Sequence, residues 1–217
     1  MIGEQQFPFL AEKGHVVSLV GGGGKTTLLY AMASHCAQKG WRVLVSTTTH
    51  ILRPENGLWA KTDAEIQELW ARGSYAVVGS PAPNGKLTAP PEADFARWMA
   101  QADAVFLEAD GAKHFPCKAP AEQEPVLMPQ SNIVLAVAGL SALGHPLKEW
   151  NKPACCWAFR RRPARPRNFW LNCWQVSRAA GNGWAAGPFM RCSIRQIRRS
   201  ANCSGSRRSV FCWNVIV

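Results

Sequence analysis

The stretch HVVSLVGGGGKTTLLYAMASHCAQKG, residues 15–40, decides the fold. It opens with a short apolar run over residues 15–20 that suits a buried strand. Four glycines follow, and apolar residues then recur at three- and four-residue steps until Lys39-Gly40 marks a helix end. This order predicts a phosphate-binding loop, because glycines let backbone N–H groups turn towards an anion at a helix N-terminus. A tight strand-to-helix turn with an exposed lysine is the alternative.

The loop assigns candidate nucleotide-binding residues, which are Gly21, Gly22, Gly23, Gly24, Lys25, Thr26 and Thr27. In such loops the lysine reaches the β- and γ-phosphates, and the hydroxyl after it binds Mg²⁺. We therefore expect Lys25 to be catalytic and Thr26 to be a metal ligand. Leu19 stands where the common G-x-x-x-x-G-K-[ST] pattern has its first glycine, so this is a shortened loop, similar to the loops of the Mur-ligase type.

The rest of residues 1–150 alternates between strand and helix patterns. Further strands are predicted over 41–46, 75–79, 104–110 and 132–138, and helices over 62–72 and 92–102. Thr62 and Glu65 have the spacing of a capping box, and Asn84-Gly85 predicts a turn. The alternation predicts an α/β fold, a three-layer sandwich like that of P-loop NTPases, with a mostly parallel sheet and ligands at the carboxyl ends of its strands.

Two carboxylates end the predicted strand AVFLEAD, residues 104–110. Glu108 and Asp110 are two residues apart, so strand alternation places them on the same face. We expect Asp110 to complete the Mg²⁺ shell as a Walker-B-type residue and Glu108 to polarise an attacking water. The alternative for either residue is that it only ends the strand.

Polar residues close the second strand on the same side of the predicted sheet. In TTTH, residues 47–50, we expect Thr48 and Thr49 to contact a γ-phosphate or a substrate, although threonines are also common in strands. Lys118 is a further candidate for binding an anion, but a single lysine is more often a solvated surface residue. His114 and Cys117 are interpreted as structural.

Basic charge is concentrated in the last third of the chain. Residues 1–150 carry 12 Lys+Arg and 14 Asp+Glu, whereas residues 151–217 carry 13 basic residues and no acidic residue, which accounts for the net charge of +11. The same segment holds six of the eight cysteines, at spacings that never form the paired C-x₂-C pattern of a zinc site. We expect residues 1–150 to be one nucleotide-binding domain and residues 151–217 to be an irregular or disordered tail.

Three interpretations of this tail are open. It is a basic extension that binds nucleic acid, a disulfide-rich module, or the product of a gene read out of frame from about Trp150. We favour the third, because shifted reading of a GC-rich gene yields Arg, Cys, Trp, Pro and Ser. Nucleic acid is therefore not an expected partner. No signal peptide and no apolar run of membrane-spanning length is present, so we expect a cytoplasmic protein without a membrane partner.

Four segments together resemble the YqeC family, accessory proteins for selenium-dependent molybdenum hydroxylases. They are LVGGGGKTTLL (19–29), STTTHI (46–51), LEADGAK (107–113) with KAP close behind, and EPVLMPQSNIVLAVAGLSALGHPL (124–147). In that family the next segment continues into an acid-containing helical part, whereas here it becomes WNKPACCWAFRRR (150–162). The resemblance implies an NTP-dependent step in maturing a selenium-containing molybdenum cofactor, or in loading it into its enzyme.

The predicted function is binding of Mg²⁺ and a nucleoside triphosphate, followed by hydrolysis or phosphoryl transfer. ATP is favoured over GTP, because no guanine-specific Asn-Lys-x-Asp motif is present. The expected partners are the nucleotide and, through the resemblance, a molybdenum hydroxylase or enzymes of its cofactor. The alternatives are a nucleotide-gated carrier that does not turn over its nucleotide and a nucleic-acid-binding protein acting through the tail.

Overall fold

The computed structural model describes residues 2–111, 115–116, 118 and 123–139, and the backbone of two strands at 196–197 and 211–216. The chain divides into two compact units. The first comprises Met1–Leu19, Lys25–Gly111 and Val126–Ser131, and the second comprises Val20–Gly24, Ala112–Pro125 and Asn132–Val217.

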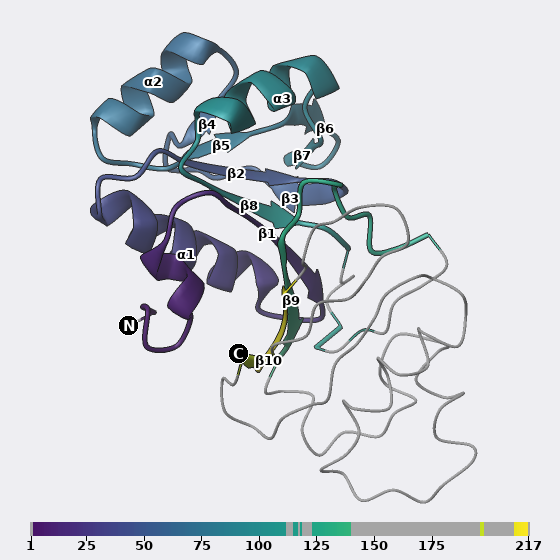
Figure 1. Cartoon of the computed structure of the whole chain (residues 1–217). Helices are drawn as coiled ribbons and strands as arrows, with labels where there is room; N and C mark the ends of the chain where they lie inside the picture. The colour runs from purple at the N-terminus through teal and green to yellow at the C-terminus, as the bar shows by residue number, and fades with distance from the viewer. Residues whose placement is uncertain are drawn as a thin grey trace, which may run out of the picture. The chain divides into compact units, whose positions relative to one another are not determined.

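A parallel sheet forms the centre of the first unit (Figure 1). Its strands lie in the order β1-β8-β2-β5-β4, and each neighbouring pair is parallel. Their bounds are β1 (His15–Gly21), β2 (Val43–Thr47), β4 (Trp59–Ala60), β5 (Ala76–Val78) and β8 (Ala104–Glu108). Strands β2, β5 and β8 are buried along their whole length, as parallel strands with covered faces must be. The predicted α/β class is confirmed.

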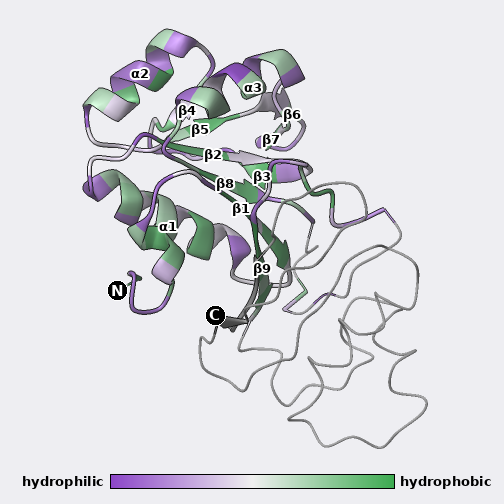
Figure 2. Ribbon diagram, viewed as in Figure 1, coloured by the Kyte–Doolittle hydropathy of each residue, from purple (hydrophilic) through white to green (hydrophobic). Residues whose placement is uncertain are grey.

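Helices cover both faces of this sheet, which gives three layers. Helix α1 (Lys25–Gln38) lies on one face, and α2 (Asp63–Ala71) and α3 (Glu92–Gln101) lie on the other (Figure 1). Figure 2 shows the strands as hydrophobic and the helices as mixed, with polar residues on their outer sides. The core between the sheet and α2 and α3 consists of Leu44, Ala60, Ile66, Leu69, Trp70, Ala76, Val78, Phe95, Trp98, Val105 and Leu107.

Strand alternation in this core determines which way β8 presents its last residue. Val105 and Leu107 pack against α2 and α3. Because successive side chains of a strand point to opposite faces, Phe106 and Glu108 belong to the face that α1 covers. A charged residue is thereby directed towards the beginning of α1.

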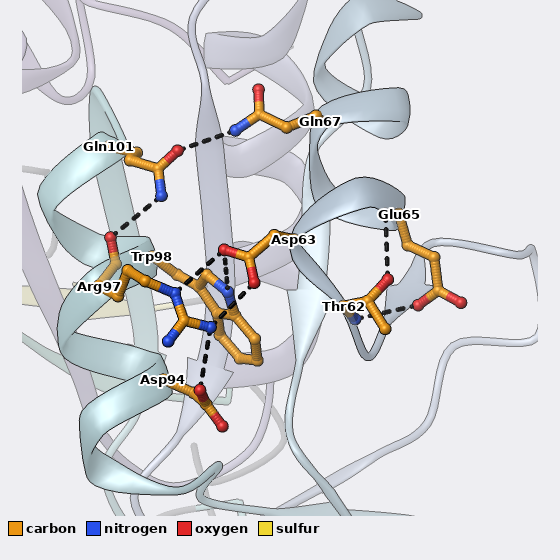
Figure 3. A network of polar contacts seen from close by, with 8 residues as sticks. All are labelled: Thr62, Asp63, Glu65, Gln67, Asp94, Arg97, Trp98 and Gln101. Atoms are coloured by element: carbon orange, nitrogen blue, oxygen red, sulfur yellow. Dashed lines mark hydrogen bonds and ion pairs between the residues drawn. The ribbon is translucent and has the colours of Figure 1, made fainter.

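Polar contacts hold α2 against α3 at the surface (Figure 3). The Thr62 hydroxyl accepts from the Glu65 N–H, and the Glu65 carboxylate accepts from the Thr62 N–H, so the predicted capping box is confirmed. Asp63, the first residue of α2, accepts hydrogen bonds from the Arg97 guanidinium at 2.8 and 3.1 Å and from the Trp98 indole at 3.2 Å. The hydrogen bond from Arg97 lowers the pKa of Asp63.

A second, small sheet stands beyond the carboxyl ends of two core strands. It is antiparallel, with the order β3-β7-β6, formed by β3 (His50–Leu52), β7 (Lys86–Thr88) and β6 (Ser80–Ala82). Strand β3 follows β2 closely, and β6 follows β5. The predicted turn at Asn84-Gly85 is confirmed: both residues have positive φ, 61° and 67°, and they lie among the three residues that join β6 to β7.

The N-terminal segment contributes a short 3₁₀ helix, η1 (Pro8–Ala11), whose residues Phe9 and Leu10 are buried. Within the described part of the chain, no helix combines the length and apolar character that crossing a membrane would require.

The second unit contains its own strands. Strand β9 (Ile133–Ala138) pairs in parallel with β11 (Phe211–Ile216), which pairs antiparallel with β10 (Gln196–Ile197). The strand predicted over 132–138 is confirmed by β9. Apart from β10 and β11, the predicted irregular tail lies outside the described residues.

Candidate functional site

Four of the predicted site residues meet where β8 ends and α1 begins. The Lys25 ammonium lies 3.0 Å from Oδ1 of Asp110, and the Thr26 hydroxyl donates to Oε2 of Glu108 at 2.8 Å. Lys25 and Thr26 are the first residues of α1, whereas Glu108 and Asp110 end and follow β8. Lys25 and Thr26, which are consecutive in α1, therefore contact two residues that are two positions apart, Asp110 and Glu108.

The Lys25–Asp110 ion pair is almost completely removed from solvent. The two side chains are 2% and 4% exposed. Charged groups are rarely buried to this extent unless they are paired, because each loses its hydration. The attraction between the two charges offsets part of that loss, and removing either partner would leave the other charge buried without it.

Glu108 is in a different electrostatic state. Burial raises the pKa of its carboxyl and outweighs the Lys25 charge and the Thr26 hydrogen bond, which lower it. The Asp110 charge also raises the pKa, and the Lys86 charge lowers it. A carboxyl held in this way takes up a proton more readily than an exposed glutamate does.

The threonine run, residues 47–49, links the end of β2 to the end of β8 through hydrogen bonds. The Thr47 hydroxyl and the Thr48 N–H both donate to the carbonyl of Glu108, at 2.9 and 3.0 Å. The Thr48 hydroxyl donates to the Val126 carbonyl at 2.6 Å, and the Thr49 N–H donates to the Thr47 hydroxyl at 3.0 Å. In this structure the run holds the Glu108 backbone in place, and ligand contacts by Thr48 and Thr49 stay a prediction.

The glycine run is shaped by contacts inside the second unit. Gly21 has φ of 104°, and a Cβ on it would lie 2.3 Å from the Val137 carbonyl oxygen, so no other residue fits there. The Gly22 N–H donates to the same carbonyl at 2.8 Å, and the Gly23 N–H donates to the Pro116 carbonyl at 3.1 Å. These amides take part in main-chain hydrogen bonds here, which the sequence did not indicate.

Gly24 and Thr27 are the remaining residues of the predicted loop. Gly24 also has a positive φ, 93°, and Thr27 is exposed on the first turn of α1. Phosphate contacts by Gly21, Gly22, Gly23, Gly24 and Thr27 stay predictions.

Lys118 is not the solvated surface residue that its isolated position in the sequence suggested. Its side chain is 3% exposed and pairs with Glu124. His114 and Cys117 lie outside the described residues. No group of three or more His, Cys, Asp or Glu side chains that could hold a metal occurs in the described ranges.

Two residues near the site were not singled out from the sequence. Lys86, on the small sheet, acts electrostatically on Glu108. Tyr30, on α1, stacks on Tyr75 with ring centroids 5.8 Å apart, and burial, Tyr75 and Glu108 together raise its pKa. Its hydroxyl donates to the Leu52 carbonyl at 3.4 Å. Their proximity to the site depends on tertiary structure, and no local pattern marks them.

Comparison with known proteins gives the family. A family model described as YqeC protein matches residues 17–152. The chain belongs to the YqeC family. It is 36% identical over 136 residues to the uncharacterized protein YqeC of Escherichia coli strain K12. That alignment covers 59% of this chain and 53% of the relative, so the chain spans about half the length of the curated relative that it matches. No solved structure matches the chain.

The extent of the YqeC match agrees with the composition of the chain. All candidate site residues, from Gly21 to Lys118, lie within it. It ends at residue 152, next to the point where acidic residues cease.

Proposed function

We propose that this YqeC protein binds a nucleoside triphosphate with Mg²⁺, ATP in preference to GTP, at the carboxyl end of β8. The observation that carries the proposal is the meeting of Lys25 and Thr26, at the start of α1, with Asp110 and Glu108. Open α/β sheets bind their ligands beyond the carboxyl ends of their strands. A lysine and a hydroxyl that follow a glycine run, set against carboxylates on a neighbouring strand, are the groups that hold phosphates and Mg²⁺ in phosphate-binding loops.

The donor atoms at this place suit Mg²⁺. The Thr26 hydroxyl and the Asp110 carboxylate are oxygen ligands, and Mg²⁺ commonly binds proteins through one or two carboxylates together with phosphate oxygens. When bound, the ion would neutralise charge on the phosphates. Lys25 would hold the β- and γ-phosphates. Gly22 and Gly23, whose N–H groups donate to the Val137 and Pro116 carbonyls, would exchange these acceptors for phosphate oxygens. Glu108 would orient and polarise the attacking water or acceptor.

The cellular role that we propose rests on the family resemblance. It is an NTP-dependent step in maturing selenium-dependent molybdenum hydroxylases, carried out in the cytoplasm with the hydroxylase or an enzyme of its cofactor as the partner.

One observation favours a carrier that hydrolyses its nucleotide slowly or not at all. Oε2 of the buried Glu108 carboxylate accepts from the Thr26 hydroxyl at 2.8 Å, and an oxygen engaged in this way is less available to take a proton from water. Single-turnover release of phosphate separates the two functions. An enzyme releases phosphate with nucleotide alone, whereas a carrier does so only when its client protein is added.

Nucleotide binding is tested with the full chain by calorimetry, using Mg·ATP and Mg·GTP. Lys25→Ala removes the charge-assisted contacts to phosphate and should weaken binding by about a hundredfold or more. Lys61→Ala is the matched control, because it removes an exposed lysine whose ammonium lies over the ring of Trp59. Equal affinity of the Lys25→Ala variant and the parent for both nucleotides would exclude a phosphate-binding loop.

The tail carries a separate proposal, that residues 151–217 are read out of frame. The test is to resequence the gene across codons 140–217 and to translate all three frames. An acid-containing, amphipathic continuation in another frame supports the proposal. If no frame has one, the arginine-rich tail is genuine, and binding to nucleic acid that weakens steeply with salt becomes the competing expectation.

A further inference from the structure

The carboxylate proposed as a metal ligand already has a cation beside it. The Lys25 ammonium lies 3.0 Å from Oδ1 of Asp110, with 2% and 4% of the two side chains exposed. Lys25 is thus directed at the carboxylate proposed to bind the metal, so the same Asp110 would have to serve two cations.

A free divalent cation meets two obstacles at Asp110. The first is repulsion by the Lys25 ammonium, which is strong because the pair is buried and poorly screened by water or salt. The second is the hydration shell of Mg²⁺, which the ion gives up reluctantly and which a nearly solvent-free carboxylate cannot accommodate. Displacing Lys25 without giving it another anion would separate a buried charge from the carboxylate with which it pairs.

A nucleoside triphosphate removes both obstacles. Its phosphate oxygens offer Lys25 a second set of anionic partners, and they bring the metal with part of its shell already made of phosphate oxygens. Thr26 follows Lys25 on α1, and its hydroxyl reaches the neighbouring carboxylate, Glu108, at 2.8 Å. The metal and the polyphosphate would therefore enter together.

We propose that Lys25 gates the metal site: it excludes free divalent cations from Asp110 and admits the cation only together with a polyphosphate. The gate rests on the proposed function, since it presumes that a metal and a nucleotide bind at this end of β8. It adds an order of binding, and it keeps the site closed to the Mg²⁺ that is always present in cells.

The test measures Mn²⁺ binding to the full chain, with Mn²⁺ as a stand-in for Mg²⁺, by equilibrium dialysis. Free Mn²⁺ and Mn·ATP then equilibrate on both sides of the membrane, and only the excess on the protein side counts as bound. The parent should bind Mn²⁺ alone at least about tenfold more weakly than it binds Mn²⁺ in the presence of ATP. Lys25→Met should gain affinity for Mn²⁺ alone by about tenfold or more, because the like charge is gone while the carboxylate stays. Lys25→Arg keeps the positive charge and should stay closed.

Two further variants show where a gained ion binds. Lys25→Met combined with Asp110→Asn should lose the gain, and Lys61→Met, which removes an exposed lysine elsewhere in the unit, should behave as the parent. Thermal unfolding of each variant verifies that it is folded. If Lys25→Met is unfolded, Lys25→Gln, which also removes the positive charge, is measured in its place.

The outcomes separate the gate from the proposed function. Equal affinity of the parent for Mn²⁺ with and without ATP, while ATP itself binds, overturns the gate and leaves nucleotide binding intact. A folded Lys25→Met variant that gains no Mn²⁺ affinity also overturns it. If the parent binds no ATP, the proposed function fails, and with it the gate in the form proposed.

Discussion

The two ends of β8 carry carboxylates in opposite environments. At the amino end, Asp103 accepts a hydrogen bond from the Arg42 N–H at 2.9 Å and forms ion pairs with the Arg42 guanidinium and the Lys13 ammonium, each at 3.3 Å. Both basic side chains are about half exposed. At the carboxyl end, by contrast, Asp110 and Glu108 are buried, and Asp110 faces an equally buried lysine.

The pKa values of Asp103 and Glu108 move in opposite directions. Burial alone would raise the pKa of Asp103, but the hydrogen bonds from Arg42 and Lys13 outweigh it, and the pKa is lowered. At Glu108 burial outweighs its favourable partners, and the pKa is raised. The amino end is thus electrostatically satisfied, whereas the carboxyl end holds charge at a cost that a ligand with its own charges could relieve. This difference supports the proposal that a charged ligand binds at the carboxyl end.

Asp110→Asn should have the largest effect on stability. It leaves the Lys25 ammonium buried without its carboxylate, which we expect to lower the free energy of unfolding by about 3 kcal/mol. Urea denaturation measures the change. The double variant with Lys25→Met should recover part of the loss, because it removes the uncompensated charge. If Asp110→Asn lowered the free energy of unfolding by less than Asp103→Asn does, the contrast between the two ends of β8 would be wrong.

Asp103→Asn should have a smaller effect, at most about 1 kcal/mol, because its cationic partners are exposed and can be hydrated once the carboxylate is gone. The pH range in which the Asp103 carboxylate stabilises the fold follows from its lowered pKa. The stability that the ionised group contributes is present above the ordinary value of 3.8 and is lost as pH falls through the lower folded pKa. The variant should therefore differ from the parent at neutral pH and converge with it in acid.

Of the three substitutions, Glu108→Gln should change the free energy of unfolding least, but it should change the dependence of that free energy on pH most. The folded protein holds the Glu108 proton more tightly than the unfolded chain does, so the parent loses stability as pH rises from the ordinary value of 4.5 through the raised folded pKa. The glutamine lacks this loss and can still accept from the Thr26 hydroxyl. Unfolding by urea below pH 4.5 and at neutral pH should show the variant gaining on the parent at the higher pH. Parallel pH profiles would contradict the assignment of opposite pKa directions to the two ends.

Sequence patterns sufficed for the long elements of the fold. The apolar runs behind β1, β2, β8 and β9 are five to seven residues long, and the capping box at Thr62 fixes where α2 begins. The strand expected over 104–110 ends at Glu108, so Asp110 follows the strand and is not part of it. Strands β3, β6 and β7 have three residues each, too few to show a period of two, and they were not predicted.

The candidate site was only partly predictable for a similar reason. Lys25, Thr26, Glu108 and Asp110 belong to motifs whose spacing is local, and the structure brings them together. The burial of Lys118, the influence of Lys86 on Glu108 and the main-chain partners of Gly22 and Gly23 arise between segments distant in the chain. No local pattern encodes such contacts.

The small sheet constrains how this family can be re-engineered. It pairs strands from two separate segments of the chain. Strand β3 lies in the segment between β2 and β4, whereas β7 lies in the segment between β5 and α3. Ile51 and Leu87, paired across it, are 2% and 0% exposed. A chimera that takes only one of these two segments from a relative would pair a strand of the relative with a strand of this chain. Grafts meant to exchange the region beyond β2 and β5 between relatives should therefore move both segments as a single cassette.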